Sequence, residues 1–249
     1  MAADPELIKR AEDLLNRCNQ RSIVTHSLFL TPAEQYSLKQ HFKHRADAKF
    51  VLSGGTHNTE RNIAFFLPEW YIEDDPSSEC ISAVKLITGF GNPGHRDYLG
   101  AVLALGIKRE WIGDIIINDD TAYILCINSV KDSIIYDLDH VGRFGVKRSE
   151  IPLSEIPPII IRTKEIVFTV QSSRLDAITG AMFGISRSKA AQCINEGLVT
   201  LNYSQCTDTD HSVSLGDIIS FRGKGKGVLS EEGGMSRKGR TYYTANIYI

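Results

Sequence analysis

The chain has 249 residues, of which 42% are hydrophobic and 23% charged, a composition that excludes wholly disordered, collagen-like and disulfide-rich classes. The formal net charge of −2 does not by itself favour a nucleic-acid binder. From residue 172 to the end, however, nine lysines and arginines accompany seven acids, so this part carries +2 and the remainder −4. The sequence has no apolar run near the roughly 20 residues that span a bilayer. It also has no signal-peptide pattern, so we expect a cytoplasmic protein.

The pattern of apolar residues predicts an α+β chain of three parts, with boundaries at residues 1–75, 76–164 and 165–249. In the first part, residues 7–15 have helical spacing. A second helix is predicted to begin at Thr31, an N-cap residue followed by Pro32. Two strands, at 49–52 and 62–67, are predicted on either side of a loop rich in glycine, asparagine and threonine.

The middle part alternates between strand and helix patterns. Strands are predicted at 81–88, 114–118, 122–127 and near Val146, with helices at 95–105 and after a cap at Ser129. The order β-α-β-β-α-β predicts a ferredoxin-like domain. The proline-rich residues 151–158 are predicted to end it as a linker.

The third part begins with a predicted strand at 166–170. Two short helices follow, at 175–183 and 187–196, each with a serine expected at its cap. Short strands are predicted at 198–202, 217–221 and 242–249.

One alternative function depends on GFGNPG, which runs from Gly89 to Gly94 and matches the glycine pattern of dinucleotide-binding loops. Asp114 and Asp119 lie roughly where a ribose-binding acid would fall. Pro93 weakens this interpretation because proline removes an amide N–H from a loop whose amides should bind phosphate. A nucleotide-binding protein therefore stays open as an alternative.

A second alternative depends on Arg174-Leu175-Asp176, which has the letters of the pseudouridine-synthase motif whose aspartate is the nucleophile. Only about 70 residues follow, which is too few for that catalytic domain. Asp176 is therefore expected to be an acidic residue at a helix N-terminus, where its charge interacts favourably with the helix dipole. An RNA-modifying enzyme stays open as the alternative. The five scattered cysteines contain no CxxC pair, and His41 and His44 have no clear partner, so no metal and no other cofactor is expected.

The third part as a whole resembles the S4-like RNA-binding domain, in which a helix pair and an adjoining strand present a basic face to structured RNA. The matching stretches are RLD at 174–176, SRSKAA at 186–191, EGLVTLN at 196–202 and GDIIS at 216–220. Arg187 and Lys189 fall in the first turn of a predicted helix, where cations and backbone N–H groups can share a phosphate. In RGKGKG at 222–227, glycines allow close approach while cations reach phosphates.

The residues predicted to contact RNA are Arg174, Ser186, Arg187, Ser188, Lys189, Asn202, Arg222, Lys224 and Lys226 in the third part, and Arg96, Lys108 and Arg109 in the middle part.

The rest of the chain is similar to the bacterial YlmH family, on FLTPAEQ at 29–35, the Gly54-Gly55 turn and GHRDYLGAVLALGIKREWIGDIII at 94–117. The resemblance implies a non-enzymatic RNA-binding protein of the large ribosomal subunit, linked to the rescue of stalled subunits that hold peptidyl-tRNA. It implies rRNA and possible tRNA partners and no small-molecule substrate or membrane.

Overall fold

The computed structural model describes residues 4–72, 75–89 and 91–249. The chain divides into two compact units, Ala2–Ile160 and Ile161–Ile249. The N-terminal region and the middle domain expected from the sequence lie together in the first unit. No helix in the described part of the chain is long and apolar enough to cross a membrane.

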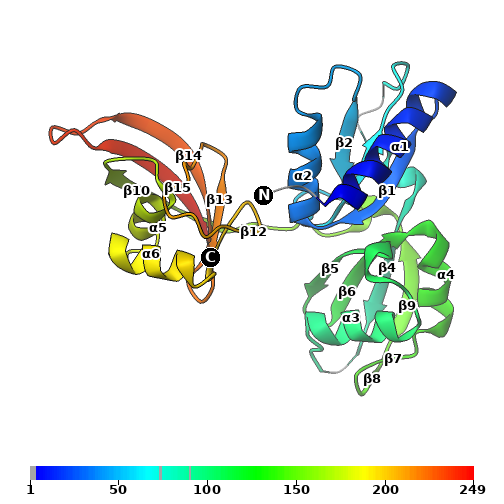
Figure 1. Cartoon of the computed structure of the whole chain (residues 1–249). Coiled ribbons are helices and arrows are strands. Elements are labelled where there is room, and N and C mark those ends of the chain that lie inside the picture. Colours follow the sequence, from blue (N-terminus) through cyan, green and yellow to red (C-terminus); the bar gives the residue numbers. More distant parts are fainter. Residues whose placement is uncertain (1–3, 73–74, 90) are drawn as a thin grey trace. The chain divides into compact units, whose positions relative to one another are not determined.

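The N-terminal region packs two helices beside a three-stranded antiparallel sheet of order β1-β3-β2 (Figure 1). Its elements are α1 Pro5–Arg21, β1 Thr25–Leu30, α2 Pro32–Phe42, β2 Phe50–Ser53 and β3 Asn62–Phe66. The predicted cap is confirmed, because the Thr31 side chain accepts from the N–H of Glu34 and the Glu34 carboxylate accepts from the N–H of Thr31. Strand β1 was not predicted.

The middle domain has a four-stranded sheet of order β5-β6-β4-β9 in which all neighbouring strands are antiparallel. Its main elements are β4 Ile81–Ile87, α3 His95–Ala104, β5 Ile112–Asn118, β6 Thr121–Ile127, α4 Asn128–Asp137 and β9 Lys147–Ile151. The two strands of each βαβ unit are separated by a third, which is the ferredoxin-like arrangement that the sequence predicted.

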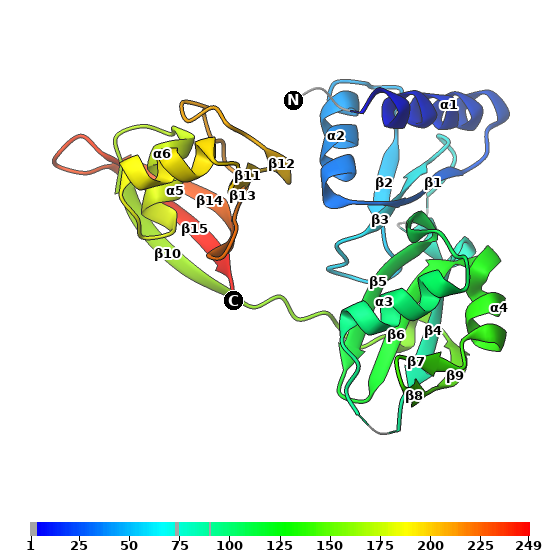
Figure 2. The same ribbon diagram turned by 60° about the horizontal axis from the view of Figure 1, so that its bottom comes forward.

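Alternate residues of this sheet pack on opposite faces. On one face, Val84 and Leu86 pack with Tyr98 of α3 and Ile134 of α4, and both helices lie over that face (Figure 2). On the other face, Ala83 and Leu125 belong to a second core with residues of the N-terminal sheet, including Phe29 and Phe65. This shared core explains why the first two parts form one unit.

The remaining elements of the first unit are short. They are η1 Pro76–Glu79, η2 Arg109–Trp111, β7 His140–Val141, β8 Phe144–Gly145 and η3 Leu153–Glu155. The hairpin of β7 and β8 was not predicted. The predicted cap at Ser129 is wrong, because α4 begins one residue earlier, at Asn128, with Ile127 in the N-cap position.

The C-terminal unit has a six-stranded antiparallel sheet of order β10-β15-β14-β13-β11-β12. Its elements are β10 Thr163–Val170, α5 Leu175–Met182, α6 Arg187–Asn195, β11 Val199–Leu201, β12 Ser204–Gln205, β13 Ile218–Phe221, β14 Gly225–Met235 and β15 Thr241–Tyr248. Ile178 of α5 and Ile194 of α6 pack on this sheet in one core with Leu229 and Ala245.

The predicted serine cap of α5 is wrong, and strand β14 was not predicted. Helix α5 has no serine cap: Arg174 is its N-cap and makes no capping hydrogen bond. Instead, the N–H groups of Leu175 and Asp176 donate to the carbonyls of His211 and Thr209, which satisfies the helix start. The basic, glycine-rich stretch at 222–227 continues into the 11-residue strand β14, which the sequence did not predict.

Candidate nucleic-acid interface

The start of α6 presents two cations at an exposed helix N-terminus. Ser186 is the N-cap, and its hydroxyl accepts from the N–H of Lys189 at 3.2 Å. The hydroxyl of Ser188 lies 3.1 Å from that of Ser186. Arg187 and Lys189 are exposed, and the first turn of α6 contains no acidic residue. Helix N–H groups, hydroxyls and cations together form a site suited to a phosphate.

Beneath this helix start, the buried carboxylate of Asp176 binds two arginines. It lies 3.0 Å from the guanidinium of Arg174 and 3.0 Å from that of Arg187. Burial alone would raise the pKa of Asp176, but the hydrogen bonds and charges of the two arginines outweigh it, so this pKa is lowered. Arg174 also pairs with Asp210. Arg174 is therefore an internal anchor, whereas the side chain of Arg187 is still 53% exposed.

A second group of cations lies at the turn between β13 and β14. Arg222 and Lys224 are exposed there, on a turn that needs the positive φ of Gly223 (+81°). Lys226 is different, because its ammonium lies over the rings of Tyr248 and Tyr203, at 4.5 and 5.9 Å from their centroids. These cation–π contacts already engage Lys226.

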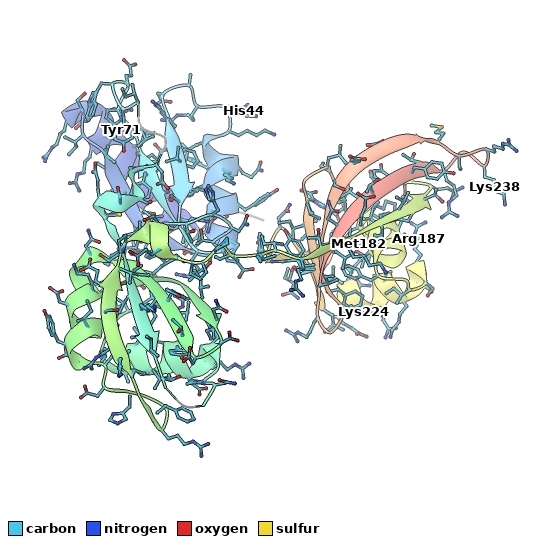
Figure 3. The ribbon with its side chains drawn as sticks, turned by 180° about the vertical axis from the view of Figure 1, so that it is seen from behind. His44, Tyr71, Met182, Arg187, Lys224 and Lys238 are labelled. Carbon is cyan, nitrogen blue, oxygen red and sulfur yellow. The ribbon has the colours of Figure 1, made fainter. Side chains whose placement is uncertain are left out.

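The structure places the two groups at opposite ends of α6. The N–H of Arg222 donates to the carbonyl of Leu198, which follows the C-terminal end of the helix, whereas Arg187 begins it. Nine helical residues separate the ends by about 14 Å. Figure 3 labels Arg187 and Lys224 well apart on this unit. The cations thus form a line, which suits the repeated charges of a nucleic-acid backbone better than one small anion.

Asn202 holds the fold at a turn. It is buried and left-handed, with φ +49°. Its side-chain amide donates to Asp217 at 2.8 Å, and its side-chain oxygen accepts from the N–H of Ile218 at 3.0 Å. Both ends of the amide therefore bind protein, which leaves Asn202 a positioning role.

The structure gives the predicted middle-domain cations different surroundings. Arg96 is exposed, but Asp97, Asp137 and Asp139 line the same surface groove. The ammonium of Lys108 lies 6.0 Å from the ring centroid of Trp111. The next residue, Arg109, donates to the carbonyls of Ile112 and Gly113, and burial lowers its pKa to about 10. Its guanidinium is thus committed to the backbone.

The geometry does not support the two alternative sites. At the glycine pattern ending in Gly94, in which Phe90 lies outside the described residues, the carboxylate of Asp97 accepts from the N–H of Gly94 at 2.8 Å. The helix start thus already holds an anion. Asp114 accepts from the N–H groups of Glu60 and Arg61, so it is not free for a ribose.

Asp176, the candidate nucleophile of the second alternative, is only 4% exposed and bound by two arginines. The described residues contain no group of three or more histidines, cysteines or acids that could hold a metal ion.

Sequence reasoning missed the cations of the turn between β14 and β15, namely Arg237, Lys238 and Arg240. Lys238 and Arg240 line the same groove as Arg187. The signal was present, because SRKGR at 236–240 combines cations with a turn glycine as RGKGKG does. These residues were not predicted to contact RNA because the stretches that resemble the S4-like domain end at residue 220.

Comparison with known proteins agrees with this organisation. A family described as "Putative RNA-binding domain in YlmH" matches residues 80–155, and the S4 domain family matches residues 173–219. The "Ribosome-associated protein quality control protein P2" of Bacillus subtilis (strain 168) is 30% identical over 213 residues, which cover 84% of this chain and 82% of that protein. The chain belongs to the YlmH family.

A solved YlmH structure shares the fold. The "Cell division protein ylmH from Streptococcus pneumoniae" superposes with a TM-score of 0.51 at 22% identity, covering 61% of this chain and 93% of that one. The YlmH and S4 resemblances predicted from sequence are thereby confirmed. The S4 match contains Arg187 and Lys189 but ends before Arg222 and Lys224.

Proposed function

We propose that this chain is a non-enzymatic factor that binds ribosomal RNA on the large subunit, beside tRNA, in the rescue or quality control of stalled translation in the cytoplasm. The observation that carries the proposal is the line of exposed cations along α6, formed by Lys189, Arg222 and Lys224 with Arg187. The ribosomal and quality-control part is supported by the name of the Bacillus subtilis relative.

The test is co-sedimentation with purified bacterial ribosomal subunits, with and without bound peptidyl-tRNA, over a range of salt concentrations. The informative variant is Lys189→Glu/Arg222→Glu/Lys224→Glu, because these side chains are exposed and no acidic partner is seen for them among the described residues. Arg187 is avoided, since Arg187→Glu would place a carboxylate against buried Asp176. A glutamate at position 189 suits the helix dipole, so this substitution is not expected to destabilise α6.

We expect salt-sensitive retention of the wild-type chain on large subunits and a loss of about 100-fold or more in affinity for the triple variant. The matched control is Lys9→Glu/Arg17→Glu/Lys39→Glu, which makes the same charge change on exposed residues of α1 and α2. Equal retention of the two variants on large subunits would refute the proposed interface. No retention of the wild-type chain would refute the ribosomal role.

The non-enzymatic part has its own test. The enzyme alternative requires the carboxylate of Asp176 to reach a uridine, yet it is buried between Arg174 and Arg187. We expect no pseudouridine when the wild-type chain is incubated with ribosomal RNA and the product is analysed by mass spectrometry. Turnover that Asp176→Asn abolishes, while RNA binding persists, would show that the chain is an enzyme.

A further inference from the structure

The C-terminal unit contains a groove of about 510 Å³ that shares Arg187 with the α6 interface but does not include Arg222 or Lys224. One wall is the start of α6, with Arg187; the other is the β14–β15 hairpin, with Lys238 and Arg240. Its floor includes the small residues Ala177 and Gly180 of α5. None of the described residues that line it is acidic.

The hairpin tip that carries two of these cations has a defined conformation. The N–H of Ser236 donates to the carbonyl of Arg240 at 2.7 Å, and the N–H of Gly239 donates to the carbonyl of Ser236 at 2.9 Å. The guanidinium of Arg240 donates to the carbonyl of Thr169 in β10 at 2.6 Å. The first two bonds lie within the tip, and the third joins the tip to β10, the strand that precedes α5 in the chain. The two walls of the groove are thus held on one framework, which lowers the cost of ordering the site on binding.

The tip is also far from the β13–β14 turn. The 11 residues of β14 separate Lys224 from the tip by about 35 Å. Figure 3 shows Lys238 at the end of the hairpin and Lys224 at the other end of the sheet. One phosphate cannot contact both turns, so a phosphate bound by the tip cations would be a different one from a phosphate bound at the β13–β14 turn.

We propose that this groove is a second RNA site, in which one sugar-phosphate strand passes between the start of α6 and the β14–β15 hairpin. Two cationic walls, an acid-free lining and a floor of small side chains suit a chain of phosphodiesters, each with one negative charge. The hairpin lies outside the S4 match, which ends at residue 219. The inference rests on the proposed function and extends its interface beyond the S4 domain.

The test compares three variants in titrations with purified bacterial large ribosomal subunits at several salt concentrations. Arg237→Glu/Lys238→Glu changes the tip without altering the Arg240 anchor. We expect it to lower affinity about tenfold or more and to reduce the slope of log affinity against log salt by about 1 for each phosphate contact that is lost. The matched control Lys9→Glu/Arg17→Glu, one lysine and one arginine on α1, should change neither quantity.

The third variant, Ala181→Leu, fills the groove without altering a charge. If a strand occupies the groove, this variant weakens binding with an unchanged salt slope. Hydrogen exchange in α5 and α6 must match the wild-type chain, to show that the helices are intact. If it does not, Ala181→Val is used instead, because valine still fills part of the groove with a smaller side chain than leucine.

The outcomes separate the two proposals. If the wild-type chain binds and Lys189→Glu/Arg222→Glu/Lys224→Glu abolishes binding, but the tip variant retains wild-type affinity and slope, the groove site is wrong and the proposed function stands. If the wild-type chain does not bind large subunits at all, the proposed function falls and this inference with it.

Discussion

Each of the two units binds an aspartate carboxylate, and the two do so by different means. In the C-terminal unit, Asp176 is bound by the guanidinium groups of Arg174 and Arg187. In the first unit, Asp114 accepts from the backbone N–H groups of Glu60 and Arg61, at 2.6 and 3.1 Å. The first arrangement fixes a cation at the surface, whereas the second joins the N-terminal region to the middle domain.

The pKa shifts follow from this difference. Burial raises the pKa of Asp114 because its backbone hydrogen bonds only partly replace the lost water. The pKa of Asp176 is lowered because two nearby positive charges outweigh its burial. A carboxylate thus fixes an interface cation where arginines bind it, as at Asp176, and joins two regions of the fold where backbone amides bind it, as at Asp114.

The largest expected effect is that of Asp176→Asn. The substitution weakens two charge-assisted hydrogen bonds, so we expect the free energy of unfolding of the C-terminal unit to fall by about 2–3 kcal/mol. Hydrogen exchange of α5 and α6 measures this loss. Fluorescence of Trp70 and Trp111, the two tryptophans of the chain, reports on the first unit and should not change.

The control for this prediction is Asp210→Asn. Asp210 is exposed and pairs only with Arg174 among the ion pairs described, so its loss should cost less than about 1 kcal/mol. Equal effects of the two substitutions would contradict the central role of Asp176.

The second prediction concerns acid stability. The folded-state pKa of Asp176 is depressed, so its stabilisation is complete above its unfolded pKa and is lost as the pH falls through the folded value. The raised pKa of Asp114 has the opposite sign: its contribution becomes more favourable as the pH falls. Between about pH 6 and pH 3, Asp176→Asn should therefore flatten the acid-induced loss of stability in the C-terminal unit.

The same pH series on Asp114→Asn, followed by tryptophan fluorescence, should show a steeper acid loss in the first unit than the wild-type chain shows. A parallel change in both variants would contradict this difference, because it would mean that the two carboxylates have the same kind of surroundings.

The sequence predicted most regular elements because their signals are local. Thr31-Pro32 marks a helix start by itself, and the strands of the middle domain are apolar enough to stand out. Strand β14 was missed because GKGVLSEEGGM contains four glycines and two glutamates, which are poor strand formers. Its conformation is set by pairing with β13 and β15, which the sequence pattern does not show.

For the interface, the residue types could be predicted from the sequence, but which cations are exposed and unpaired could not. Arg109 and Arg222 look alike as isolated arginines, yet one binds two carbonyls and the other is exposed. Asn202 lies in a matching motif, but its positive φ commits it to a turn. Which cations are free depends on contacts between residues far apart in sequence, as in the pairing of Arg187 with Asp176.

The third prediction tests helix starts within the C-terminal unit. Ser186 caps α6 by accepting from the N–H of Lys189, so Ser186→Ala should lower the free energy of unfolding by about 1 kcal/mol. Ser173, beside the start of α5, makes no cap, because carbonyls of the 209–211 loop bind the first N–H groups. Ser173→Ala should therefore change stability by less than about 0.5 kcal/mol, measured by the same hydrogen exchange. Equal losses of stability for Ser186→Ala and Ser173→Ala would mean that a serine stabilises the start of α5 as well.

The smallest expected effect is on RNA affinity, from Arg96→Glu/Lys108→Glu in the middle domain. Three aspartates share the groove of Arg96, so RNA phosphates would meet negative charge there. We expect a loss of less than about threefold in large-subunit binding, from altered long-range charge alone, with an unchanged salt slope. A loss as large as that of the α6 variant would show that the RNA-binding family matched at residues 80–155 contacts RNA directly through these cations. The interface would then include residues of both units. The exposure and partners of a cation within its own unit would then not be enough to predict whether it contacts RNA.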